Sequence, residues 1–216
     1  MRGVAIITSK GGVGKTTLCH LLAIGAVWRN VPAYLFHTDN REPMATEQRP
    51  YAYIDGRDAN TLETVISSLL KSDGVIIVDG GGNRPEIDMW LAEHMDLVLI
   101  PVMADTESVN LGIETMQRLE GQGINNARYI LNMVSTNEKA RLYDFEHFFS
   151  RLDKEKIAGQ VKRMDAVKRL SMPDAPDRPF QTPPSNVNNL SRSLWQIVDD
   201  TLEKMDVPAD EIAETA

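Results

Sequence analysis

The sequence contains almost no cysteine. Cys19 is the single cysteine among 216 residues, so the chain cannot form an internal disulfide. It falls just after a glycine-rich stretch, where a first helix would pack. We therefore expect a small buried side chain at this position rather than a reactive thiol.

Long hydrophobic runs are also missing. The most apolar stretches, 74–79 and 97–103, are far shorter than the roughly 20 residues that a membrane span requires. The first ten residues reach glycines too soon for a secretory signal, and the acidic end of the chain is unsuited to anionic lipid. We expect a cytoplasmic protein with one domain over residues 1–205, no membrane partner and a frayed acidic tail over 206–216.

An excess of basic charge is the third absence. A net charge of −8 and a pI near 5.0 argue against a protein whose whole surface coats nucleic acid. The segment 139–192 differs, because it holds eleven bases and seven acids, a net charge of +4. On a helix, some of these bases could share a broad face for non-specific DNA, or form a solvated surface paired with Asp165: Lys162, Arg163, Lys168 and Arg169.

Short, β-branched apolar runs alternate with helical patterns along the chain. Runs this apolar are typical of strands buried on both faces. Five runs fit this description: 4–8, 33–38, 75–79, 97–102 and 128–134. The predicted fold class is α/β, with a mostly parallel central sheet and helices on both of its faces.

Apolar stripes at helical spacing predict core-facing helices over three segments: 62–70, 142–152 and 190–202. Asn60, with Glu63 three residues later, can cap the start of the first. Pro85 suits the first turn of another helix. Residues 171–186 contain five prolines, so we expect a loop laid over a site or a sheet edge.

The most informative stretch follows the first predicted strand and reads K-G-G-V-G-K-T-T. Glycines let consecutive backbone N–H groups turn inward around an anion, and the start of a helix adds partial positive charge. Lys15 would reach the β- and γ-phosphates of a nucleotide, and the hydroxyl of Thr16 would bind Mg²⁺. The predicted phosphate-binding residues are Lys10, Gly11, Gly12, Val13, Gly14, Lys15, Thr16 and Thr17.

This loop has a second lysine, Lys10, and carries Ser9 where a standard phosphate loop has its first glycine. In both respects it resembles the deviant Walker A loop of the ParA/MinD-type ATPases. The resemblance implies that Lys10 is catalytic. It would cross a homodimer with ATP sandwiched between the subunits and contact the phosphates bound by the partner, as an arginine finger does elsewhere.

The resemblance extends to two segments that sense the nucleotide. Asp39 matches the second aspartate of a family pattern and would orient the attacking water or hold Mg²⁺ through water. His37 stands where the family has the first aspartate, and it is either a base or a hydrogen-bonded strand-end histidine. Asn40 and Arg41 also depart from the family pattern. Asp79 ends an apolar strand before three glycines and would hold Mg²⁺ through water, so the predicted metal set is Thr16, Asp39 and Asp79.

Two residues are candidates for the base-binding part of the site. Asn132 interrupts an apolar strand, where family members have an asparagine facing adenine; a core amide bonded to the backbone is the alternative. Pro183, in the proline-rich segment, matches the region that closes over the base.

The resemblance implies a Mg²⁺-dependent ATPase, slow and stimulated by a partner protein, that dimerises on ATP to partition or position intracellular cargo. Two alternatives remain: a biosynthetic P-loop enzyme of related fold, and a nucleotide-binding scaffold with little hydrolysis. The single cysteine argues against a reductase component, because a shared iron–sulfur cluster usually takes two cysteines per subunit.

Overall fold

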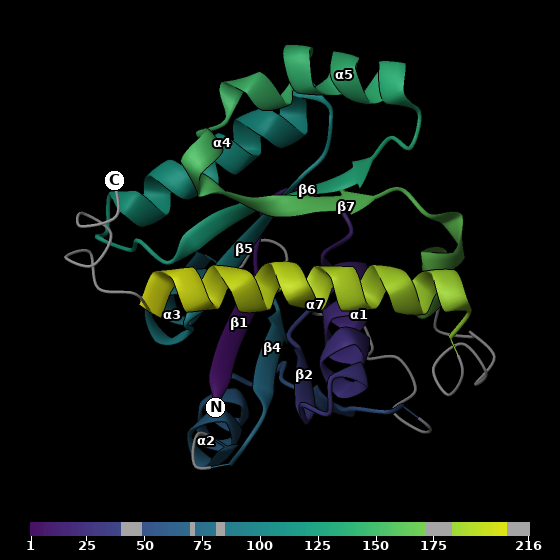
Figure 1. Ribbon diagram of the computed structural model, residues 1–216. Coiled ribbons are helices and arrows are strands. Elements are labelled where there is room, and N and C mark those ends of the chain that lie inside the picture. Colours follow the sequence, from purple (N-terminus) through teal and green to yellow (C-terminus); the bar gives the residue numbers. More distant parts are fainter. Residues whose placement is uncertain (40–48, 70–71, 81–84, 172–182, 207–216) are drawn as a thin grey trace, which may run out of the picture.

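The computed structural model describes residues 1–39, 49–69, 72–80, 85–171 and 183–206. Its centre is a seven-stranded sheet in the order β3-β2-β4-β1-β5-β6-β7, with every neighbouring pair parallel (Figure 1). The strands are β1 (Arg2–Ile6), β2 (Ala33–His37), β3 (Ala52–Asp55), β4 (Val75–Asp79), β5 (Leu97–Val102), β6 (Ala127–Val134) and β7 (Ile157–Lys162). The predicted α/β class with a parallel sheet is confirmed.

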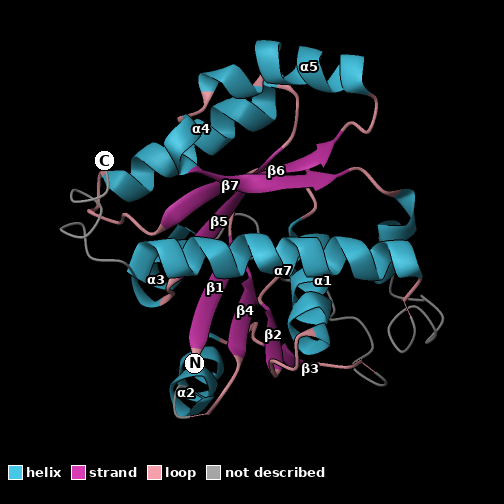
Figure 2. Ribbon diagram, viewed as in Figure 1, coloured by secondary structure: helices cyan, strands magenta, loops and turns pink. Residues whose placement is uncertain are grey.

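Helices cover both faces of this sheet (Figure 2). They are α1 (Lys15–Trp28), α2 (Ala59–Leu69), α3 (Pro85–His94), α4 (Thr106–Glu120), α5 (Glu138–His147) and α7 (Ser185–Asp206), with short 3₁₀ segments η1 (Phe149–Arg151), η2 (Lys154–Lys156) and η3 (Asp165–Ser171). The helices α1 and α7 pack on one face, and α2, α3 and α4 pack on the other. None of the helices within the described ranges is long and apolar enough to cross a membrane.

The alternation of side chains along β1 explains the two layers. Val4 and Ile6 point into the cluster under α1 and α7, while Ala5 and Ile7 point into the cluster on the opposite face. Cys19, on α1, is fully buried in the first cluster, as expected, and burial raises the pKa of its thiol well above the ordinary value. The central strands are therefore apolar on both sides because each side faces a helix.

Two strands escaped prediction. β3 and β7 form the two edges of the sheet, and most of their residues are half-buried or exposed. An edge strand has one hydrogen-bonding neighbour and less apolar cover, so its sequence lacks the continuous hydrophobic run that marks the central strands.

The stripe predicted over 142–152 is wrong for its first half. Phe149 and Leu152 are 1% and 4% exposed, but Leu142 is 61% exposed and Phe145 38% exposed, and α5 has no buried residue. The chain enters the core only after α5 ends, through η1. A periodic apolar pattern shows that a helix has an apolar face but does not show that another element covers it.

Two of the helix starts were predicted to within two residues. Pro85 is the first residue of α3, as expected. Asn60 lies inside the first turn of α2 rather than before it, because that helix begins at Ala59.

The predicted helical face of basic residues is wrong. Lys162 ends β7, Arg163 follows it, and the next two bases belong to the separate segment η3. Because these residues are divided between a strand end and a 3₁₀ segment, they do not lie along one helix. The proline-rich residues 172–182 and the tail 207–216 lie outside the described residues.

The contact between α1 and α7 depends on Gly25. A Cβ atom there would overlap the carbonyl oxygen of Ser191 and lie 2.9 Å from Cβ of Trp195. We predict that Gly25→Ala lowers the free energy of unfolding by about 2–3 kcal/mol in urea denaturation, because the two helices must separate. The control Gly121→Ala, at the end of α4 where φ is −62°, should change it by less than about 1 kcal/mol. Equal stability of the two variants would contradict this packing.

Candidate functional site

The site lies where the carboxyl ends of three adjacent strands meet. β1 pairs with β4 on one side and β5 on the other, with Ile6 opposite Asp79 and Leu99. The loop that leaves β1 is therefore bordered by the end of β4 and by the turn that follows β5. In open parallel sheets, ligands bind at this edge.

The glycines of the loop have the backbone geometry that a phosphate loop needs. Gly12 and Gly14 have φ angles of 77° and 87°, which side chains with a Cβ rarely adopt. Gly14 is the N-cap of α1 and provides no side-chain cap, so the first N–H groups of the helix are left for an anion. A Cβ at Gly14 would lie only 2.7 Å from Nδ2 of Asn132.

Thr16 and Asp79 meet beneath this loop. The Thr16 hydroxyl donates to Oδ2 of Asp79 at 2.6 Å, and Asp79 is 3% exposed. Burial raises the pKa of Asp79 above its ordinary value, an effect that the hydrogen bond from Thr16 and the charge of Lys15 only partly offset. Within the described part of the chain, Oδ1 of Asp79 is buried without a hydrogen-bond partner. A hydroxyl beside an uncompensated carboxylate oxygen fits Mg²⁺, which is held by few protein oxygens plus phosphates and water.

The end of β2 lies beside the end of β4, so residues 37–39 stand near Asp79. Thr38 is fully buried, and its hydroxyl donates to the backbone oxygen of Asp79 at 2.7 Å. His37, 6% exposed, stands opposite Asp79 in the sheet register. The charge of His37 lowers the pKa of Asp79 and that of half-buried Asp39 raises it, so both lie within electrostatic range.

The structure describes only some of the other predicted switch residues. Gly80 donates its N–H to the carbonyl of Ile6 at 3.0 Å. Residues 81–84 and 40–48, which include Asn40 and Arg41, lie outside the described residues.

Aromatic side chains surround Arg49, which lies shortly before β3. The Arg49 guanidinium donates to the Tyr51 hydroxyl at 3.0 Å and lies 4.7 Å from the centre of the Tyr53 ring. The Tyr51 hydroxyl is also 2.7 Å from Nδ1 of His20, a fully buried residue of α1. Burial, and then the charge of Arg49, lower the pKa of His20 well below its ordinary value. These contacts tie the segment before β3 to the helix that begins at the phosphate loop.

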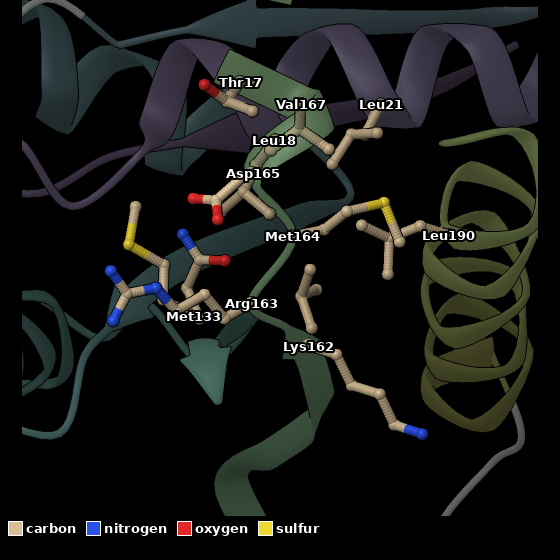
Figure 3. Close-up of a pocket in the computed structure, with 12 residues that line it drawn as sticks. Thr17, Leu18, Leu21, Met133, Lys162, Arg163, Met164, Asp165, Val167 and Leu190 are labelled. Carbon is tan, nitrogen blue, oxygen red and sulfur yellow. The ribbon is translucent and has the colours of Figure 1, made fainter. Parts of the chain in front are cut away.

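A cavity of about 170 Å³ opens beside the loop (Figure 3). It is lined by Thr17, Leu18, Leu21, Asn132, Met133, Val161, Lys162, Arg163, Met164, Asp165, Val167 and Leu190. Its mixture of apolar walls and a few polar groups is typical of small-molecule sites.

Asn132 links the cavity to the loop. It lines the cavity, and its Nδ2 donates to the carbonyl of Val13 in the loop at 2.7 Å. The alternative of a backbone-bonded amide is thus confirmed as a contact. Pro183 is buried and accepts a hydrogen bond from Nδ2 of Asn188 at 3.0 Å, but it is not among the residues that line the cavity.

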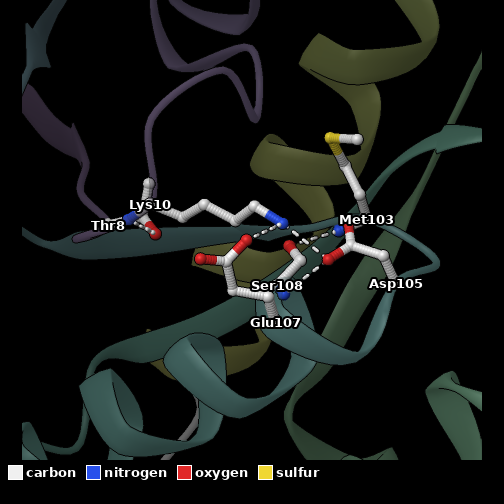
Figure 4. A network of polar contacts seen from close by, with 6 residues as sticks. All are labelled: Thr8, Lys10, Met103, Asp105, Glu107 and Ser108. Carbon is white, nitrogen blue, oxygen red and sulfur yellow. Dashed lines mark hydrogen bonds and ion pairs between the residues drawn. The ribbon is translucent and has the colours of Figure 1, made fainter.

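Lys10 points away from the loop and toward the start of α4 (Figure 4). Its Nζ lies 2.5 Å from Oδ1 of Asp105 and 3.1 Å from Oε2 of Glu107. The hydrogen bond to Asp105 raises the pKa of Lys10 above its ordinary value. Burial acts to raise the pKa of Asp105, but the hydrogen bonds from Lys10 and Ser108 outweigh burial and hold this pKa below its ordinary value.

Thr38, Asp105 and Glu107 were missed by reasoning from the sequence. A signal existed for Asp105, because an aspartate three residues before Ser108 is typical of a helix N-cap, and it follows an apolar strand. No local pattern marks Thr38, whose contact with Asp79 depends on which strands are neighbours.

Among solved structures, an aspartate-to-alanine variant of Cyanothece McdA in complex with ATP is 16% identical, with a TM-score of 0.64 over 92% of this chain and 96% of the other. MinD of Pyrococcus horikoshii OT3 with Mg-ADP is 13% identical, with a TM-score of 0.66 over 96% and 99%. The MinC:MinD cell division protein complex of Aquifex aeolicus is 15% identical, with a TM-score of 0.62 over 96% of this chain and 98% of the other. At these identities the likeness establishes the fold.

No curated protein sequence matches the chain. A family model does: the CobQ/CobB/MinD/ParA nucleotide binding domain matches residues 4–176, a range that contains the glycine loop, Asp39, Asp79 and Asn132. The chain belongs to the CobQ/CobB/MinD/ParA nucleotide-binding domain family.

Proposed function

We propose that this protein is a Mg²⁺-dependent ATPase switch whose two subunits close on ATP and whose cycle partitions or positions intracellular cargo. The observation that carries the proposal is the glycine loop with a lysine at each end. Lys15 starts α1 beside the Thr16–Asp79 hydrogen bond, whereas Lys10 extends out of the loop to Asp105. One lysine is thus available to its own nucleotide and one is directed elsewhere.

The nucleotide would lie along the edge from the loop to the cavity. Its phosphates would accept hydrogen bonds from the N–H groups of the loop and from Lys15, and its base would enter the cavity near Asn132. Thr16 and Asp79 would hold Mg²⁺, Asp79 through water, and the ion would neutralise charge on the β- and γ-phosphates. Asp39 would orient the attacking water.

The dimer follows from Lys10. From its observed position Lys10 does not neutralise the phosphates of its own loop, so we assign it to the nucleotide of a second subunit, where charge develops during γ-phosphate transfer. Hydrolysis would release the segments around Asp39 and Gly80 and separate the subunits.

For the cargo and for the partner that stimulates hydrolysis, we propose only the kind of molecule involved. Among the similar structures, MinD of Pyrococcus horikoshii is a septum site-determining protein, and MinD of Aquifex aeolicus is in complex with MinC; a positioning role with a protein partner is the corresponding proposal here. The family description also includes CobQ and CobB, so a biosynthetic enzyme is the main alternative. DNA is left out of the proposal, because the bases expected to form one face are divided between β7 and η3.

The two lysines of the loop should differ in their effects on ATP binding and on dimer formation. Lys15→Ala and Thr16→Ala should raise the Kd for ATP by roughly 10- to 100-fold, because charge-assisted contacts to phosphate or metal are lost. Lys10→Ala should bind ATP within about threefold of wild type while losing turnover and the ATP-dependent dimer. Calorimetry, phosphate release and light scattering measure the three quantities. Equal loss of ATP binding in the Lys10 and Lys15 variants would contradict the trans role.

Asp39 should contribute to hydrolysis more than to ATP binding. Asp39→Ala should slow phosphate release by about 100-fold or more while ATP still binds, because the attacking water loses its orienting group. An ATP-bound dimer should then accumulate in size-exclusion chromatography. Turnover at the wild-type rate would show that Asp39 has another role and would direct the same test to His37.

The buried charge of Asp79 should lower the stability of the nucleotide-free protein. Asp79→Asn keeps an oxygen that accepts from Thr16 but removes a buried charge. Without nucleotide or magnesium, the variant should melt about 2–4 °C above wild type at neutral pH, which corresponds to about 1 kcal/mol. Its ATP turnover should be lost. Exposed Asp73→Asn is the control for removing one negative charge, and a lower melting temperature for Asp79→Asn would contradict the inferred cost.

A further inference from the structure

The contact between Lys10 and the start of α4 has a built geometry. Oδ1 of Asp105 accepts both from Nζ of Lys10 and from the backbone N–H of Ser108, the latter at 2.8 Å. The Ser108 hydroxyl in turn accepts from the N–H of Met103 at 2.9 Å, as Figure 4 shows. The acceptor is therefore fixed by the turn that caps α4 before any lysine arrives, so forming the ion pair orders mainly the Lys10 side chain.

The lysine is better covered than its partners. The Lys10 side chain is 17% exposed, whereas those of Asp105 and Glu107 are 38% and 73% exposed. Its own N–H donates to the Thr8 hydroxyl at 3.2 Å, which holds the start of the loop. Glu107 is screened by solvent and contributes little, so Asp105 provides most of the attraction.

We propose that Asp105 and Glu107 form an autoinhibitory clasp, which stores Lys10 within its own subunit and must release it before two subunits can close on ATP. This inference rests on the proposed function, because it assumes that Lys10 acts on the phosphates of a second subunit. An ammonium has three N–H donors, and those of Lys10 already face Asp105 and Glu107, so phosphates held by another subunit must compete with these carboxylates for it. The clasp thus stabilises the open monomer.

The expected size of the effect follows from symmetry. A dimer with two equivalent sites must release two clasped lysines, so any penalty per subunit enters the dimer dissociation constant twice. A partly exposed pair holds a lysine by a factor of roughly three. Removing the clasp should therefore tighten the ATP dimer by about tenfold without changing the affinity of the monomer for ATP.

The test variant is Asp105→Asn combined with Glu107→Gln. Asparagine is as good an N-cap as aspartate, so α4 keeps its hydrogen bond to Ser108 while both charges are lost. A matched control exists in the chain: Asp153 and Glu155 have the same spacing at the start of η2, and Asp153 caps Glu155 N–H at 3.0 Å. Asp153→Asn with Glu155→Gln removes the same charge from the capped start of a short 3₁₀ segment.

Dimer dissociation constants are measured by sedimentation with Mg²⁺ and a slowly hydrolysed ATP analogue. We expect the clasp variant to dimerise about tenfold more tightly than wild type and the matched control to stay within about twofold. Lys10→Ala is expected to lose the ATP dimer, and removing the clasp in that background should not restore it. Restoration of the dimer in that background would show that the acids merely repel the other subunit, and no gain with Lys10 present would show that they do not restrain it; either result overturns the clasp.

A second measurement examines the contact without a dimer. In nucleotide-free protein, acetylation of Lys10 by an amine-reactive ester, followed by mass spectrometry, should be several-fold faster in the clasp variant than in wild type. Exposed Lys139 and Lys204 serve as internal references. Equal Lys10 rates overturn the clasp while leaving the trans role intact. If Lys10→Ala forms the ATP dimer as well as wild type, the trans role fails, and the clasp fails with it as an inhibitory device.

Discussion

The parallel pairing of β1 between β4 and β5 is the constraint on which the rest of the site depends. All carboxyl ends of a parallel sheet meet at one edge, so the loop after β1 has Asp79 at the end of one neighbouring strand and Asp105 just beyond the end of the other. The helix start that binds an anion, the carboxylate beside Thr16 and the acids around Lys10 converge for this reason. Strand order, rather than proximity in sequence, assembles them.

The same edge combines a firm backbone with an uncompensated charge. Thr38 and Gly80 hydrogen-bond across β2, β4 and β1, so the ends of these strands are held in register. Asp79 nevertheless keeps one buried oxygen without a partner among the described residues. A structure optimised for stability alone would not retain this carboxylate, because a buried charge without full compensation costs free energy. A cation held by this oxygen would supply the missing compensation.

The sequence predicted the parts of this arrangement that leave a local signal. The central strands have apolar runs, the start of α3 has Pro85, and the glycine loop has a motif whose spacing follows from phosphate binding. Edge strands β3 and β7 were missed because most of their residues are half-buried or exposed, and the stripe around Leu142 was assigned to the core because periodicity does not reveal whether a face is covered. The pairing of Lys10 with Asp105 was out of reach, since it joins residues 95 positions apart through strand order.

The two lysines of the loop diverge because β1 has two neighbours. Lys15, at the start of α1, exerts its charge on Asp79 at the end of β4. Lys10 stands at the other end of the glycine run and extends to Asp105 after β5. Lys10 can therefore be held by carboxylates of its own chain at a distance from the phosphate loop. Lys15 cannot, because it starts the helix that follows that loop. In the proposed cycle, this division leaves Lys15 for the nucleotide of its own loop and holds Lys10 on its own chain until another subunit competes for it.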